Sequence, residues 1–236
     1  MRSLLIMAML TASLAHATYR DYTEVRDLQL DAADIKHLTI DAGAGPISVQ
    51  GVRGSDKILV KATITVADTD ADDARELIET SMQLTLGAKR SKATLNSSFD
   101  RGMWGSGPDA SIALEVQVPE GTELFIDDGS GSIDVVGTAA DIRIDDGSGS
   151  ISLRTVGVVN IDDGSGSVDV VDASGDVYIN DGSGSIRVEQ VAGNVKIDDG
   201  SGSIKVNNVG RDLIIIDSGS GSLSYANVAG NVEGDL

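Results

Sequence analysis

Ten aspartates recur at two adjacent positions of a repeated corner in the second half of the chain. Each copy holds an acidic pair, or an Asn or Ser variant of it, then Gly-Ser-Gly-Ser and an aliphatic residue, and the copies begin at residues 127, 145, 162, 180, 198 and 217. The carboxylates belong to Asp127, Asp128, Asp145, Asp146, Asp162, Asp163, Asp181, Asp198, Asp199 and Asp217. Ca²⁺ takes about six to eight oxygen ligands, which carboxylates, hydroxyls and backbone carbonyls can supply. These ten residues are therefore candidate Ca²⁺ ligands.

Three interpretations of the acidic columns stay open. Unit charges about 4.8 Å apart repel by roughly 1 kcal/mol in water and by more near a protein surface, so stacked carboxylates favour either raised pKa values or bound cations. The spacing matches neither an EF-hand loop nor the known nonapeptide Ca²⁺-binding repeat. An Asp before Gly also commonly caps a tight turn. The columns can be turn caps, specific Ca²⁺ sites or a surface that attracts cations diffusely.

The residue types give little support to catalysis. After residue 17 the only histidine is His37, which lies outside the repeats, so the many serines lack a basic partner. Paired aspartates could do acid–base work on a polysaccharide. A catalytic pair, however, is expected once and not in six near-identical copies. We therefore predict that the protein is not an enzyme and has no catalytic residue, and no cofactor unless the columns bind Ca²⁺.

One loop carries aromatic side chains that could contact a ligand. Residues 99–108 contain Phe99 and Trp104, the single tryptophan of the chain, among glycines and polar residues. Exposed aromatic side chains on loops are frequent contact anchors for other molecules. The alternative is that both rings plug the open end of the fold. The partner class predicted from the sequence is a surface ligand, either a polysaccharide or an envelope protein.

The elements that position these residues follow from the spacing of the corners. Successive corners begin 18, 17, 18, 18 and 19 residues apart, which indicates stacked structural repeats. Aliphatic residues alternate with polar residues on both sides of each corner, as in strands with one buried face. The sequence therefore predicts an all-β fold, a parallel β-solenoid with about 18 residues per coil. An antiparallel meander is the alternative.

Four aliphatic columns are predicted to face the interior. Those after the corner are Ile133, Ile151, Val168, Ile186, Ile204 and Leu223, and then Val135, Leu153, Val170, Val188, Val206 and Tyr225. Those before it are Leu124, Ile142, Val159, Val177, Val195 and Ile214, and then Ile126, Ile144, Ile161, Ile179, Ile197 and Ile216. Every change in repeat length falls around a second, glycine-bearing corner. Because exposed loops tolerate insertions, we expect that corner to be a plain exposed turn.

The chain before the repeats is less regular. Residues 38–47 look like a degenerate copy of the corner, and residues 69–81 have the candidate caps, acidic first turn and apolar spacing of one short helix. Short strands are predicted at residues 83–86, 93–99 and 112–118. We expect a single domain over residues 18–236, irregular over 18–121 and regular over 122–236.

The first residues match a secretory signal. Arg2 precedes an apolar stretch over residues 4–14, and Ala15-His16-Ala17 fits a cleavage site, so residues 1–17 are predicted to be a signal peptide. The chain has no Cys, which excludes disulfides and thiolate metal sites. Its formal net charge is -19, or -20 once Arg2 is removed, which argues against nucleic acid as a partner. No other apolar stretch is long enough to span a membrane. We expect an exported protein located in the periplasm, on the cell surface or in the medium.

Three features in a fixed order carry a family resemblance. They are the degenerate corner from Ile40 to Val49 ahead of a helix, the segment of residues 112–122, and the run of Gly-Ser-Gly-Ser-Ile units. In these features the chain resembles the bacterial putative-adhesin family known as domain of unknown function 4097. Membership implies a β-solenoid in the bacterial envelope and implies no known catalytic residue. The chain departs from the family pattern in the regularity of its acidic pairs.

Overall fold

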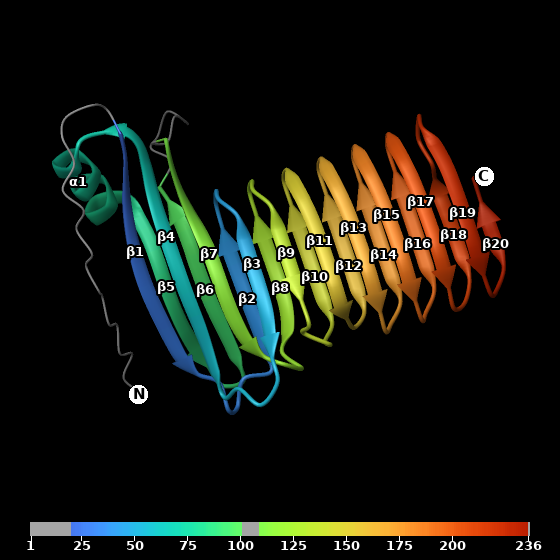
Figure 1. The fold of residues 1–236 in the computed structure, drawn as a ribbon, viewed down its shortest axis with the longest axis horizontal. Helices are drawn as coiled ribbons and strands as arrows, with labels where there is room; N and C mark the ends of the chain where they lie inside the picture. The colour runs from blue at the N-terminus through green and yellow to red at the C-terminus, as the bar shows by residue number, and fades with distance from the viewer. Residues whose placement is uncertain (1–19, 101–108, 236) are drawn as a thin grey trace.

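The computed structural model describes residues 20–100 and 109–235 and shows a parallel β-solenoid (Figure 1). Two ten-stranded sheets lie face to face, and the coils follow one another along the long axis of the molecule. A continuous aliphatic core fills the space between the sheets. The predicted parallel β-solenoid is confirmed. The antiparallel alternative does not apply to the repeats, because their strands pair in parallel.

Each regular coil gives one strand to each sheet. Sheet A contains β9 (Ile133–Val136), β11 (Gly149–Val156), β13 (Gly166–Ala173), β15 (Gly184–Val191), β17 (Gly202–Val209) and β19 (Ser222–Val228). Sheet B contains β8 (Glu123–Asp128), β10 (Ile142–Asp146), β12 (Val159–Asp163), β14 (Val177–Asp181), β16 (Val195–Asp199), β18 (Leu213–Asp217) and β20 (Val232–Gly234). Equivalent residues stack directly, as Ile126, Ile144 and Ile161 do. The acidic corner links the sheet B strand of each coil to the sheet A strand that follows it.

Burial follows the predicted columns through most of the solenoid. In β10, Ile142 and Ile144 are buried while Arg143 between them is exposed. The same alternation of buried and accessible residues recurs in β12, β14 and β16. Burying such an aliphatic side chain contributes about 1.5–3 kcal/mol by removing apolar surface from water. The stacked columns therefore supply both the stability and the register of the corners.

The predicted columns are wrong at the last corner. Ile214 and Ile216 were expected to face the interior, but Ile216 is 43% exposed and the buried residues are Leu213 and Ile215. The pairing of β18 with β16 shifts by one residue at this point. Ile216 is thus the extra residue of a β-bulge. Because of this extra residue, the buried residues before the corner lie one position earlier than predicted. Tyr225, which belongs to a predicted inward column, is 45% exposed because β19 pairs with described strands on one side only.

The N-terminal part adds strands to the same two sheets. Sheet A continues through β3 (Ile47–Val52), β7 (Ala110–Pro119), β4 (Lys57–Thr69) and β1 (Arg20–Asp31). Sheet B continues through β2 (His37–Ala42), β6 (Lys92–Phe99) and β5 (Met82–Lys89). Strands β2 and β3 flank the degenerate corner and pair in parallel with β8 and β9, so they form a coil of their own. Strand β4 is antiparallel to both β1 and β7, and this layer ends the parallel stack.

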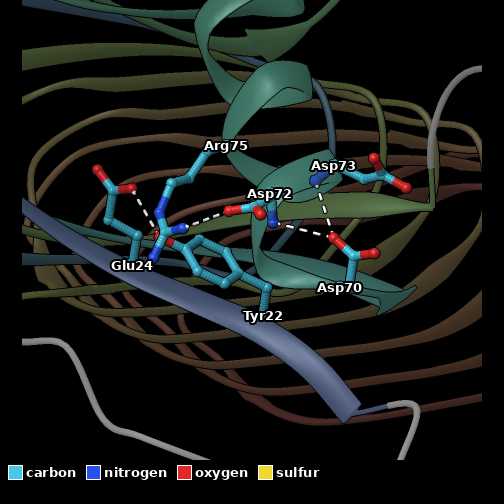
Figure 2. Close-up of polar contacts among 6 residues, drawn as sticks. All are labelled: Tyr22, Glu24, Asp70, Asp72, Asp73 and Arg75. Atoms are coloured by element: carbon cyan, nitrogen blue, oxygen red, sulfur yellow. Dashed lines mark hydrogen bonds and ion pairs between the residues drawn. The ribbon is translucent and has the colours of Figure 1, made fainter. Parts of the chain in front are cut away.

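Helix α1 (Ala71–Ser81) lies at the N-terminal end of the solenoid (Figure 1). Asp70 caps it, because one carboxylate oxygen accepts hydrogen bonds from two N–H groups of the first turn at 2.9 and 3.0 Å. Arg75 donates to Asp72 at 3.0 Å, and its guanidinium lies 5.5 Å from the centre of the Tyr22 ring on β1 (Figure 2). The predicted helix is confirmed. The polar face of the helix therefore contacts β1, the outermost strand of sheet A.

The second corner is an exposed turn, as predicted, and its backbone bends in the same way in each regular coil. In the first regular coil Ala139 at this corner has a positive φ of 50°. One equivalent residue at this corner in every regular coil has a φ between 55° and 71°. These residues are Gly137, Thr155, Asp172, Gln190, Asn208 and Asn227. Left-handed backbone costs an L-residue about 1–2 kcal/mol, and glycine and asparagine tolerate it best. Because most of these positions are not glycine, the stack of coils imposes the conformation.

Replacing Thr155 by asparagine is expected to stabilise the protein by about 0.5–1 kcal/mol. Thr155 is β-branched and has a φ of 55°, a region that asparagine adopts more readily. The substitution removes a hydrogen bond from Thr155 Oγ1 to Asp172, but that bond is exposed and contributes little. Thermal melting measures the gain. Thr94→Asn on the extended strand β6 is the matched control and should destabilise slightly, since threonine favours strands. A lower melting temperature for T155N would contradict the strain argument.

Candidate functional site

The acidic corner places its two aspartates on opposite faces of the strand. Each pair ends a strand of sheet B, where successive side chains point to opposite sides. The second aspartate therefore shares the inward face of the aliphatic residue two positions before it, as Asp128 does with Ile126. The first aspartate points outward. The ten candidate Ca²⁺ ligands thus form an inner row and an outer row instead of two neighbouring surface columns.

The inner aspartate row consists of Asp128, Asp146, Asp163, Asp181 and Asp199. These residues are 0–3% exposed. In the last four, Oδ1 accepts a hydrogen bond of 3.0–3.2 Å from the N–H of the serine two residues later. The turn-cap interpretation is therefore confirmed for these four. Their Oδ2 atoms, and both oxygens of Asp128, have no hydrogen-bond partner among the residues that the structure describes.

Burial raises the pKa of every aspartate in the inner row. The pKa of Asp128 and Asp163 rises to about 6, first through burial and second through the carboxylates of neighbouring coils. Burial also raises the pKa of Asp146, Asp181 and Asp199, while the hydrogen bond from the serine N–H opposes the rise. None of these pKa shifts involves a Lys, Arg or His of the described chain. The inner row therefore lacks a compensating cation from this part of the protein.

The outer aspartate row is exposed or half-buried. It consists of Asp127, Asp145, Asp162, Asn180, Asp198 and Asp217. Asn180 interrupts the line of charge because its amide is uncharged. Its Nδ2 donates a hydrogen bond to Asp162 Oδ1 at 3.0 Å. Within residues 20–100 and 109–235, no three His, Cys, Asp or Glu side chains gather into a group that could hold a metal ion. Ca²⁺ binding by either row stays a prediction.

The outer face of sheet A carries a groove to which no sequence pattern pointed. It has a volume of about 550 Å³ and crosses β1, β4, β7 and β3. We call it the sheet groove. Lys61 and Glu115 form an ion pair in it, with Nζ and Oε1 2.6 Å apart, so these two charges compensate each other. Asp27 also lines the groove and adds negative charge.

Five outward-facing residues form a line through the sheet groove and onto the next strand. This amide row consists of Gln29, Leu59, Gln117, Gln50 and Val136, which lie opposite one another on β1, β4, β7, β3 and β9. Leu59 and Val136 are 38% and 39% exposed. The three glutamine amides make no hydrogen bond to another residue of the described chain. The row therefore offers free donors, free acceptors and apolar surface across five neighbouring strands, a span of about 19 Å.

The Toastrack family, domain of unknown function 4097 (DUF4097), matches residues 35–235. The chain belongs to the Toastrack family. The resemblance predicted from the repeated corners is thereby confirmed. No functionally curated protein matches this Toastrack chain.

Three solved structures are similar to the Toastrack chain over most of its length. A "putative cell adhesion protein" from Clostridium sporogenes is 14% identical, with 92% of this chain and 100% of that chain covered and a TM-score of 0.40. A "putative adhesin" from Bacteroides fragilis is 12% identical, with 90% and 97% covered and a TM-score of 0.42. A "putative lipid binding protein" from Parabacteroides distasonis is 14% identical, with 91% and 97% covered and a TM-score of 0.41.

Only part of the predicted contact loop belongs to the described Toastrack structure. Phe99 ends β6, is half-buried and packs against the aliphatic core. Trp104 falls within residues 101–108, which lie outside the described residues, so the choice between a contact loop and a plug stays a prediction. His37 lies on β2, where its Nδ1 is 2.9 Å from Glu123 Oε2 of β8.

The predicted signal peptide of residues 1–17 lies outside the described part of the Toastrack chain, so export stays a prediction. Among residues 20–100 and 109–235, no helix is both long and apolar enough to cross a membrane. Helix α1 spans only 11 residues and carries Asp72 and Asp73 in its first turn.

Proposed function

We propose that this Toastrack protein is an exported, non-enzymatic binding module of the bacterial envelope and that the sheet groove is its ligand-binding site. The amide row is the observation that carries the proposal. Its three glutamine amides are accessible and make no hydrogen bonds within the described chain, and two exposed aliphatic side chains lie in line with them. Ligand sites are usually concave and combine apolar surface with a few polar groups that orient the ligand.

The position of the groove suits binding. Strand β4 is paired along both edges, to β1 and to β7, and β7 is paired to β3, so the backbone under the groove is held except along the outer edge of β1. A rigid backbone loses little conformational entropy when a ligand binds. Export is supported by the signal-like residues 1–17, and the non-enzymatic class by the absence of a singular acid–base or nucleophilic constellation in the sequence.

Introducing a charge into the groove is expected to weaken binding to the bacterial envelope by about tenfold or more. Gln117→Lys places a long cationic side chain at the centre of the amide row, beside Leu59 and Gln50. The measurement is cosedimentation of the labelled protein with isolated envelopes of the producing bacterium. Gln83→Lys on β5, exposed and on sheet B, is the matched control and should bind like the wild type.

Equal binding by Gln117→Lys and wild type, with melting temperatures that show both proteins folded, would place the ligand elsewhere on the molecule. Wild-type protein that does not cosediment with envelopes at all would overturn the proposed function.

A further inference from the structure

The chemistry of the amide row selects among ligands. Each glutamine amide has two N–H donors and a carbonyl acceptor, so Gln29, Gln50 and Gln117 can bond groups that both donate and accept. Hydroxyl groups are such partners. Leu59 and Val136 add apolar surface at two points of the same line. A sugar ring has this combination, because hydroxyls surround its edge and C–H groups cover its face.

The charges beside the amide row argue against an anionic ligand. The neighbouring line of outward-facing residues is Asp27, Lys61, Glu115, Ser48 and Asp134, placed opposite one another by the same pairing. Its single cation, Lys61, is already paired with Glu115. Asp27 and Asp134 add negative charge to this line, and Arg154, which lies opposite Val136 on β11, is paired with Asp169 at 3.7 Å. A polyanion such as a uronic-acid polymer would be repelled, as it would by the chain's net charge of -19.

The length and composition of the row argue for a polymer of sugars and against a protein. The row crosses five strands, about 19 Å, which exceeds the size of one sugar ring. Protein interfaces are usually built around buried aromatic or large apolar anchors. The amide row contains only Leu59 and Val136 as exposed apolar residues, separated by two glutamines.

Resting on the function proposed above, we infer that the ligand of the sheet groove is a neutral polysaccharide that lies across the strands along the amide row. Its ring faces rest on Leu59 and Val136, and its hydroxyls bond the amides of Gln29, Gln117 and Gln50. Asp27 and Asp134, at the two ends of the line that contains the ion pair of Lys61 and Glu115, supply the negative charge that excludes polyanions.

The first experiment measures binding to purified polysaccharides by isothermal titration calorimetry. The probes are the neutral polymers dextran, soluble β-glucan and galactomannan, and the polyanions alginate and polygalacturonate. Wild-type protein is expected to bind at least one neutral polymer and neither polyanion. The double variant Gln50→Ala/Gln117→Ala should bind about tenfold or more weakly, since it loses two hydrogen-bonding groups, whereas the sheet B control Gln83→Ala should bind like the wild type.

The second experiment separates the ligand class from the proposed function. Isolated envelopes are treated either with periodate, which cleaves vicinal diols of sugars, or with protease, and cosedimentation of the wild type is measured. Binding that periodate abolishes and protease spares supports a polysaccharide. Binding that only protease abolishes overturns the polysaccharide and leaves the groove as a protein-binding site.

Two further results would overturn the inference. One is polyanion binding as strong as neutral-polymer binding. The other is a Gln50→Ala/Gln117→Ala protein that binds the neutral polymer like the wild type, because the amide row would then not be the site. Loss of binding in the double variant is interpreted only with an unchanged melting temperature. Gln29→Ala, on the outermost strand, provides a second variant that removes a single amide of the row.

Discussion

Lowering the pH from about 8 to about 4 is expected to raise the free energy of unfolding of this protein by several kcal/mol. The inner aspartate row causes the effect. Asp128 and Asp163 have a pKa of about 6 in the folded protein, against 3.8 for an unperturbed aspartate. Between about pH 4 and about pH 6 the folded state therefore binds more protons than the unfolded state. The stabilisation is fully present below about pH 4 and is lost as the pH rises through about 6, by about 3 kcal/mol for each of the two groups.

Asp163→Asn is expected to remove the part of this pH dependence that comes from the Asp163 carboxylate. Asparagine keeps the shape of the side chain and can still accept the hydrogen bond from the Ser165 N–H, but it carries no charge to bury. At about pH 8 the variant should be more stable than the wild type by up to about 3 kcal/mol, and at about pH 4 the two should be similar. Urea unfolding across this range measures the difference. Asp145→Asn in the exposed outer row is the matched control and should keep the wild-type profile.

A difference between wild type and Asp163→Asn that does not change with pH would contradict this account. Added Ca²⁺ gives a separate check, because the Ca²⁺ prediction concerns the same residues. A melting temperature at about pH 8 that is higher in Ca²⁺ than in Na⁺ of equal ionic strength, and no longer so in Asp163→Asn, would assign a metal ion to the row. Equal melting temperatures in the two salts would speak against specific Ca²⁺ sites.

Gly166→Ala is expected to destabilise the protein by about 4 kcal/mol or more, which is exceptional for a single substitution. Gly166 begins β13 with a φ of 148°, a region that residues with a side chain rarely adopt. A Cβ at this position would overlap the carbonyl oxygen of Gly149 in the preceding coil. Both atoms are backbone-bound and held by the parallel ladder, so neither can move aside. The same collision exists at Gly184 and Gly202, so the glycine is a condition of stacking coil upon coil.

Gly87→Ala on β5 is the control for the glycine prediction. A Cβ at Gly87 would meet no atom within 4 Å, and alanine in place of an exposed strand glycine is expected to change stability by less than about 1 kcal/mol. Urea unfolding of both variants at one pH separates the close contact from the general effect of replacing a glycine. A Gly166→Ala protein as stable as Gly87→Ala would show that the corner is looser than the structure indicates.

The fold could be predicted because its signals are local and repeated. The spacing of about 18 residues and the alternation around each corner together determine the coils. Helix α1 could be predicted because its cap and its buried residues Ala74 and Ile78 all lie within one short segment. The bulge at Ile216 could not, because the aliphatic run Leu213 to Ile216 offers apolar residues to either face of the strand. Only the pairing with β16 decides which of them are buried.

The candidate site was less accessible to sequence reasoning. The inward direction of Asp128 follows from the alternation of Leu124, Ile126 and Asp128. Aspartate side chains are nevertheless rarely buried, so the residue type argues against this direction when only the sequence is considered. The sheet groove carries no such signal. It joins Gln29, Leu59 and Gln117 from three strands whose antiparallel register depends on tertiary pairing and on no repeat.

The in-register stack of coils has a mechanical consequence. The sheet groove and its amide row lie over β1, β4, β7, β3 and β9, and five further strands of sheet A extend away from them toward the C-terminal end. At about 4.8 Å per strand these coils form a stiff arm of about 24 Å. Adding or removing one coil would change the reach of the arm by one such step and leave the groove untouched. The number of regular coils thus determines how far the groove lies from the C-terminal end of the solenoid.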